Sequence, residues 1–142
     1  MKRRDFLLIS LGAALSVPAW AAESGKNSPI SIGAAINKAG RQRMLSQRMA
    51  KAFGMQMLGV MPEKAAELLG ASQRLFETQL DELRTLQPNE GIQTALGNLE
   101  KAWEGYKGVL AGKRTPENGR LVLDESEKTL RAAHALTGLY EK

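Results

Sequence analysis

The chain of 142 residues has a mass of 15.5 kDa, is 43% hydrophobic and 25% charged, and carries a net charge of +5. These values are typical of one soluble globular domain and exclude a largely disordered chain. The sequence has no cysteine and one histidine. It therefore excludes disulfide scaffolds, thiolate zinc sites, cysteine catalysis and any site that needs two histidines.

Residues 1–21 have the organisation of a secretory signal peptide. A basic start at residues 2–4 precedes an uncharged, mostly apolar run of 12 residues at 6–17, which Pro18 ends. Residues 19–21 (Ala-Trp-Ala) then give a small–x–small cleavage pattern. The run is shorter than the ~20 residues of a membrane-spanning helix. We therefore expect cleavage near Ala21 or Ala22 and not a retained anchor.

The export route stays open between two pathways. Residues 3–7, with paired arginines before Phe-Leu, fit the twin-arginine pattern, although general-route signals also have basic starts. Either route predicts a mature protein outside the cytoplasm, most simply in a bacterial periplasm. Loss of residues 1–21 removes three basic residues and one acid, which lowers the net charge from +5 to +3.

Helical patterns account for the rest of the chain. Residues 22–28 are small and polar and are expected to form a flexible leader. Ser28-Pro29 is a helix-start signal, with Ser28 as N-cap and Pro29 as first helical residue, and nothing stops this helix before about Val60. Apolar residues three and four apart predict three further helices, at residues 62–86, 89–111 and 117–140.

These segments predict the fold. No stretch alternates at period two, so no strands are expected, and the connections between the helices are short. The sequence therefore predicts an all-α, antiparallel four-helix bundle over residues 29–142, with a long first helix and Thr115-Pro116-Glu117 starting the last. The core stripe predicted for the last helix consists of Leu121, Leu123, Leu130, Ala133, Leu136 and Leu139.

Basic residues are concentrated on the first helix. Five cations occur within 14 residues that contain no acid: Lys38, Arg41, Arg43, Arg48 and Lys51. A nucleic-acid binder spreads basic residues over a whole face, so this local cluster favours a small anion as partner and argues against nucleic acid. A plain solvated helix face is the alternative, although such faces usually interleave charges of opposite sign.

Two lines of residues run along this helix at 100° per residue. The first comprises Ile36, Gly40, Arg43, Gln47, Ala50 and Gly54, and the second Asn37, Arg41, Met44 and Arg48. Small residues on the first line suit the close approach of another helix. An arginine in such a contact is costly when unpaired. The first line carries no acid, so the partner of Arg43 is either an acid on another helix or a bound anion.

Residues 36–50 read INKAGRQRMLSQRMA and match I-N-x-A-G-x-x-R-M-x-S-x-R at every fixed position. This pattern resembles the signature of PilJ-type and NarX-type sensor domains. These are periplasmic helical bundles of type IV pili methyl-accepting chemotaxis transducers and of nitrate/nitrite-responsive histidine kinases. Beyond helix one the resemblance is limited to a bundle of this length.

The resemblance implies a homodimer that binds a small oxyanion, nitrate or nitrite, at a two-fold interface between first helices. Arg43 of each subunit would clamp the anion, Gly40 would let the backbone approach, Lys38 lies at a position linked to anion response, and Arg48 matches a second invariant arginine. A planar anion with several acceptor oxygens would satisfy both Arg43 forks. Asn37 completes the predicted binding residues, and Ile36, Gln47, Ala50 and Gly54 form the predicted interface.

Two departures from the family pattern affect the function. Arg41-Gln42 replaces the small-then-apolar pair of the nitrate kinases and is typical of the broader PilJ-type group, which leaves the identity of the anion open. Family receptors also carry two membrane spans and an output domain. We therefore expect an exported sensor domain without its own output, acting on a membrane-bound signalling protein. The alternative is a periplasmic interaction module that docks on a membrane receptor and binds no small ligand.

Other constellations are interpreted structurally. Met44, Met49, Met55, Met57 and Met61 are expected to pack in the core or an interface, with Cu(I) binding as the alternative. His134 is expected at the surface or with a satisfied ring, and not as a metal ligand. The acids at 81–82 and 124–127 are expected in solvated ion pairs, and one of them is the rival partner of Arg43 or Arg48. No nucleophile motif, phosphate loop or metal motif occurs, so we expect neither an enzyme nor a cofactor.

Overall fold

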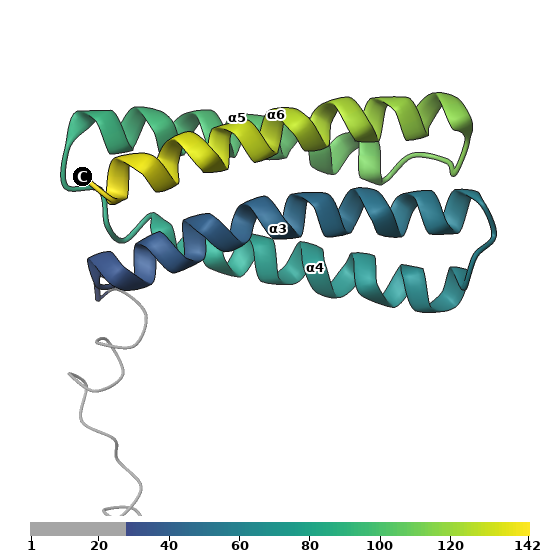
Figure 1. The fold of residues 1–142 in the computed structure, drawn as a ribbon, viewed down its shortest axis with the longest axis horizontal. Coiled ribbons are helices and arrows are strands. Elements are labelled where there is room, and N and C mark those ends of the chain that lie inside the picture. The colour runs from purple at the N-terminus through teal and green to yellow at the C-terminus, as the bar shows by residue number, and fades with distance from the viewer. Residues whose placement is uncertain (1–27) are drawn as a thin grey trace, which may run out of the picture.

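The computed structural model describes residues 28–142, so the predicted signal peptide and residues 22–27 of the leader lie outside the described residues. Four helices run up and down in one bundle: α3 (Ile32–Met57), α4 (Pro62–Leu83), α5 (Glu90–Leu110) and α6 (Pro116–Tyr140) (Figure 1). The described part of the chain contains no strand. The predicted all-α four-helix bundle is confirmed.

The helices are not packed evenly around the bundle. α3 packs against both α4 and α6, and α5 packs against α6, whereas α4 and α5 approach each other less closely. Large side chains fill this more open side, where Phe76 of α4 and Trp103 of α5 stack with 4.4 Å between ring centroids. Tyr106 packs edge-on against Trp103, and both residues are buried in the core, as predicted.

The first helix begins at Ile32, and the predicted N-cap at Ser28 is wrong. Ser31 caps the helix, because its side chain accepts a hydrogen bond from the main-chain N–H of Ala34. The preceding segment is held elsewhere: Ile30 packs against the core and donates its N–H to Thr85 Oγ1 at 3.1 Å. This tertiary contact keeps residues 28–30 out of the helix.

The other helix ends follow local signals. α3 ends at Met57, three residues before the predicted Val60, and the connection turns through the left-handed conformations of Gly59 (φ 70°) and Met61 (φ 44°). Asn89 and Thr115 cap α5 and α6 by accepting the N–H groups of Ile92 and Asn118. Pro116 is the first residue of α6, which confirms the predicted start signal.

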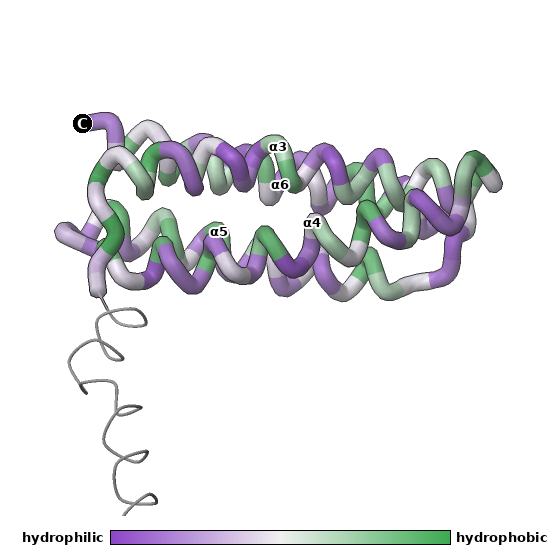
Figure 2. The backbone as a smooth tube through the Cα atoms, turned by 90° about the horizontal axis from the view of Figure 1, so that it is seen from below, coloured by the Kyte–Doolittle hydropathy of each residue, from purple (hydrophilic) through white to green (hydrophobic). Residues whose placement is uncertain are grey.

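Hydrophobic and hydrophilic residues alternate along each helix (Figure 2), as expected for elements that bury one face. The predicted core stripe of α6 is wrong at its first two positions: Leu121 is 49% and Leu123 is 56% exposed, and Val122 between them is 2% exposed. Residues three or four positions apart lie on the same face of a helix. Val122 therefore lies on the inner face of α6, and the adjacent Leu121 and Leu123 point away from the core. The inner face of α6 consists of Val122, Ser126, Thr129, Ala133, Leu136, Thr137 and Tyr140.

Candidate functional site

The signature on α3 divides into an inner and an outer face. Its inner residues are fully buried and fix α3 to the other helices. Gln42 donates from Nε2 to the carbonyl of Phe76 on α4 at 3.1 Å. Ser46 donates from Oγ to the carbonyl of Ser126 on α6 at 2.7 Å. The inner residues of the signature therefore hold the bundle together. The outer face carries the side chains that a ligand can reach.

Arg43 is the central residue of the outer face. Its side chain is partly buried at the α3–α6 edge, where Nε donates to the carbonyl of Gly40 at 3.3 Å and Nη1 contacts Nδ1 of His134 on α6 at 2.8 Å. A Cβ at position 40 would lie 3.3 Å from Nη2 of Arg43. The glycine therefore leaves the room in which the guanidinium lies along the helix backbone.

The cations of this segment are mostly without acidic partners. Lys38 pairs with Glu82 of α4, with 2.6 Å between Nζ and Oε2. Within residues 28–142 no carboxylate pairs with Arg41, Arg43, Arg48 or Lys51. Arg48 donates a hydrogen bond to the sulfur of Met44, at 3.7 Å. The sequence left open an acid on another helix as the partner of Arg43 or Arg48. No acid of the described helices takes this role. The outer face of α3 carries an uncompensated positive charge.

The structure brings only some of the predicted site residues together. Arg43 and Gly40 are in contact, whereas Lys38 points toward α4, on the other side of α3 from the α6 contact of Arg43. Asn37 is exposed and Arg48 is partly exposed on the solvent side of the helix. Within one subunit the predicted binding residues therefore form a central pair, Gly40 and Arg43, with the others around it.

The predicted interface residues lie at the surface and not in the core. Ile36, Ala50 and Gly54 are partly exposed and Gln47 is exposed. Ala50 and Gly54 line a shallow, mostly apolar depression of about 370 Å³ between α3 and α6, together with Leu123 and Met57. The small-residue line thus borders α6 and remains accessible, so a second helix has room to pack on it.

His134 is the residue that sequence reasoning did not connect with the site. It lies 91 residues from Arg43 in the chain, and its side chain is exposed as expected. A single histidine on an amphipathic helix gives no signal for such a contact, because only the packing of α6 on α3 brings the two side chains together.

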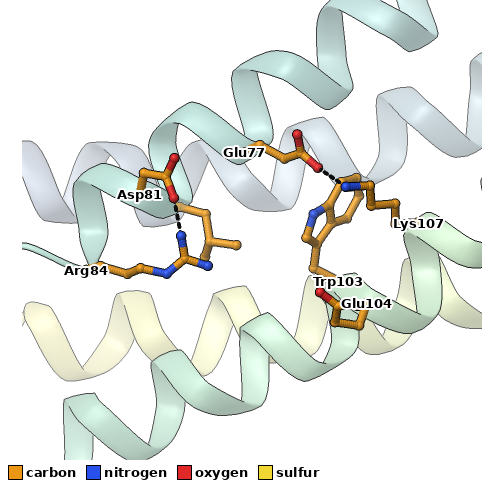
Figure 3. A pocket seen from close by; sticks show the side chains of 7 residues that line it. Glu77, Asp81, Arg84, Trp103, Glu104 and Lys107 are labelled. Carbon is orange, nitrogen blue, oxygen red and sulfur yellow. Dashed lines mark hydrogen bonds and ion pairs between the residues drawn. The ribbon is translucent and has the colours of Figure 1, made fainter.

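A second pocket lies between α4 and α5 (Figure 3). It has a volume of about 260 Å³, and Leu80 and Trp103 line it together with charged residues. Glu77 accepts from Lys107 at 2.7 Å, and Asp81 pairs with Arg84. The hydrogen bond from Lys107 to Glu77 raises the pKa of Lys107. The carboxylates of this pocket, which include Glu104, outnumber its cations, so its charge disfavours an anion.

The methionines do not form one cluster. Met49 is buried in the core, Met55 and Met57 are partly buried, and Met44 and Met61 are exposed. Core packing is thus confirmed for Met49, whereas Met44 and Met61 lie outside the core, and their packing in an interface stays a prediction. Among residues 28–142 there is no group of three or more histidine, aspartate or glutamate side chains arranged to hold a metal ion.

None of the four described helices combines the length and apolar character needed to cross a bilayer.

Comparison with known proteins bears on this geometry. The sequence model of a family described as "PilJ: Type IV pili methyl-accepting chemotaxis transducer N-term" matches residues 31–117. The match covers α3, α4 and α5, and it includes the whole signature with Gly40 and Arg43. No curated protein and no solved structure matches the chain.

Proposed function

Because this chain belongs to the PilJ family of type IV pili methyl-accepting chemotaxis transducer N-terminal domains, we propose that it binds a small oxyanion through Arg43. Membership makes the chain a sensor or signalling module of a family that is not enzymatic. The anion, of the nitrate or nitrite class, is the finer part of the proposal. It rests on the resemblance of the signature to the nitrate-responsive sensors and on the chemistry of Arg43.

The observation that carries the proposal is the state of the Arg43 side chain. Arg43 is partly buried as a residue, its guanidinium contacts the Gly40 carbonyl and His134, and no carboxylate of the described residues pairs with it. Arg43 donates one hydrogen bond to the Gly40 carbonyl and one to the His134 imidazole. The remaining hydrogens on Nη1 and Nη2 are free to donate to a ligand. A planar oxyanion supplies several acceptor oxygens to such a fork, in charge-assisted bonds.

We further propose that the anion is shared by two copies of the chain. Ile36, Gln47, Ala50 and Gly54 would face the partner across a two-fold axis, which would bring one Arg43 from each copy to the anion. Asn37 and Arg48 would lie beside the anion. Lys38 is engaged by Glu82, so its contribution to binding would be smaller than that of Arg43.

The setting of the domain is also a proposal. A periplasmic location agrees with the signal-peptide pattern of residues 1–21 and with the chemoreceptor context of the family. The domain would pass its ligand state to a membrane-bound signalling protein.

A thermal-melt screen of residues 22–142 tests the proposal. The panel holds nitrate, nitrite, sulfate and chloride at matched ionic strength, with the wild type, Arg43→Ala and a control variant, Arg74→Ala, which removes an exposed arginine of α4. A ligand at 100 times its Kd adds about 2.7 kcal/mol to the free energy of unfolding, which raises Tm by several degrees.

The outcomes separate the two candidate functions. A shift that is selective for one oxyanion, kept in Arg74→Ala and lost in Arg43→Ala, is the result we expect. If no oxyanion shifts the Tm of the folded wild type, anion sensing through Arg43 is refuted. The interaction module that docks on a membrane receptor without a small ligand then becomes the better account.

A further inference from the structure

The contact between Arg43 and His134 fixes the chemical state of the imidazole. Nη1 of Arg43 lies 2.8 Å from Nδ1 of His134. A guanidinium only donates hydrogen bonds, so Nδ1 must accept and cannot carry a proton. The ring in this arrangement is therefore neutral, with its hydrogen on Nε2.

No carboxylate of the described residues is paired with His134, and its hydrogen-bonding neighbour is a cation. From α3 the facing charged group is Arg43. On α6, Arg131 lies one turn and Glu127 two turns before the histidine, and Glu141 lies two turns after it at the C-cap. From α5, which also packs against α6, no charged side chain forms a hydrogen bond or an ion pair with His134. No carboxylate of residues 28–142 pairs with either Arg43 or His134. A protonated imidazole would then lie against a guanidinium with no negative charge to offset the repulsion.

An oxyanion at Arg43 reverses this balance. With an acceptor oxygen next to both side chains, Nη1 of Arg43 and a protonated Nδ1 of His134 would donate to the same anion. The anion would lie between two cations, which removes their repulsion and adds a second charge-assisted hydrogen bond.

We propose that His134 is a second contact residue of the oxyanion site and that its Nδ1 takes up one proton from solvent when the anion binds. The inference rests on the proposed function of Arg43. The proton comes from water or buffer, the imidazole changes from neutral to singly positive, and the bond from Nη1 to Nδ1 is replaced by bonds from both groups to the anion. Linkage then requires the anion to bind more tightly at lower pH, by at most about tenfold per pH unit, over the range in which the unliganded imidazole is neutral.

The single histidine of the chain makes the test direct, because every imidazole signal of tag-free protein belongs to His134. The ring-proton NMR resonances of residues 22–142 are followed between pH 5 and 9 in sodium nitrate and in sodium chloride at matched ionic strength. We expect nitrate to move the titration midpoint of the imidazole to higher pH in the wild type. In Arg43→Ala the midpoint is expected to be the same in both salts.

Nitrate affinity supplies the second readout. Between pH 8 and pH 6 the Kd of the wild type is expected to fall severalfold. His134→Gln keeps a neutral side chain that accepts a hydrogen bond but does not titrate, so its Kd is expected to stay constant between the two pH values. Circular dichroism confirms that the variant is folded.

The possible failures are distinguishable. If nitrate binds in an Arg43-dependent way but leaves the imidazole midpoint unchanged, the role of His134 is overturned and the proposed function stands. A pH dependence that is equal in the wild type and His134→Gln overturns it in the same way. If nitrate does not bind at pH 6 or at pH 8, nitrate sensing through Arg43 fails, and the inference about His134 fails with it.

Discussion

Tyr106 of α5 donates its phenolic hydrogen to the main-chain carbonyl of Ser46 on α3, with 2.6 Å between the two oxygens. These helices are not major packing partners in the bundle, so the bond reaches through the core. Ser46 also donates from its own side chain to the carbonyl of Ser126 on α6. One turn of α3, next to the turn that carries Arg43, is thus tied to both α5 and α6.

Replacing Tyr106 by phenylalanine tests the energy of this bond. Tyr106→Phe keeps the ring and removes the hydroxyl, and Tyr106 is fully buried. We expect the free energy of unfolding to fall by about 1 kcal/mol, the usual net contribution of a buried hydrogen bond, as measured by urea denaturation at pH 7. An unchanged free energy would mean that the bond to Ser46 contributes nothing to stability.

Stability at alkaline pH should depend on the same hydroxyl. Burial raises the pKa of Tyr106 well above its ordinary value, and a contact with the backbone of Ala50 only partly offsets this. The unfolded chain ionises this tyrosine near pH 10 and the folded chain does not, so the stabilising effect is complete below pH 10 and is lost as the pH rises above it. In urea denaturation between pH 8 and 11, the wild type should lose more free energy of unfolding than Tyr106→Phe. Tyr140, whose pKa burial also raises, remains in both proteins and cancels in the comparison.

Gly40→Ala should separate stability from ligand binding. Glycine in a helix interior costs about 1 kcal/mol relative to alanine, so this variant should gain up to about that amount in thermal or urea denaturation. The new methyl would lie 3.3 Å from Nη2 of Arg43 and displace the guanidinium, so nitrate affinity should fall severalfold.

Gly97→Ala is the matched control for this variant. Gly97 lies in the interior of α5, and a Cβ there meets nothing within 4 Å. We expect the same gain in stability and unchanged nitrate affinity. Equal nitrate affinities of the Gly40 and Gly97 variants would show that the space beside Gly40 is not used by the ligand.

Lys38→Ala should lower the free energy of unfolding slightly and should have little effect on nitrate affinity. Its partner Glu82 is 36% exposed, and such ion pairs contribute about 0.5 kcal/mol. Because Lys38 points toward α4, nitrate affinity should fall much less than in Arg43→Ala, as measured by calorimetric titration. Equal losses in the two variants would place Lys38 at the anion and require it to leave Glu82.

Phe76→Ala should open the side of the bundle between α4 and α5. The ring of Phe76 is fully buried and stacks on Trp103, and removing a buried phenylalanine costs about 3–5 kcal/mol. In residues 22–142, where Trp103 is the single tryptophan, its fluorescence emission should also shift to longer wavelength as water reaches the indole. A loss below about 1 kcal/mol would mean that the stack is not part of the stabilising core.

Periodicity and turn residues in the sequence were sufficient for the helical class, the number of helices and most of their ends. This holds because amphipathic spacing and caps such as Thr115 act within a few residues. Where a distant contact competes, as between Ile30 and Thr85, the local signal at Ser28 failed. The burial of Val122 likewise depends on the rotation of α6 about its own axis against the neighbouring helices. The spacing of apolar residues in the sequence does not determine that rotation.

The sequence by itself singled out the α3 signature and its excess of positive charge, because both are properties of consecutive residues. Only the tertiary structure decided the partners of those charges: Lys38 is engaged by Glu82, whereas Arg43 meets His134. It also separated buried signature residues such as Ser46 from the exposed outer face. The physical reason is that ion pairs and hydrogen bonds depend on distances between side chains on different helices, and the packing of the bundle sets those distances.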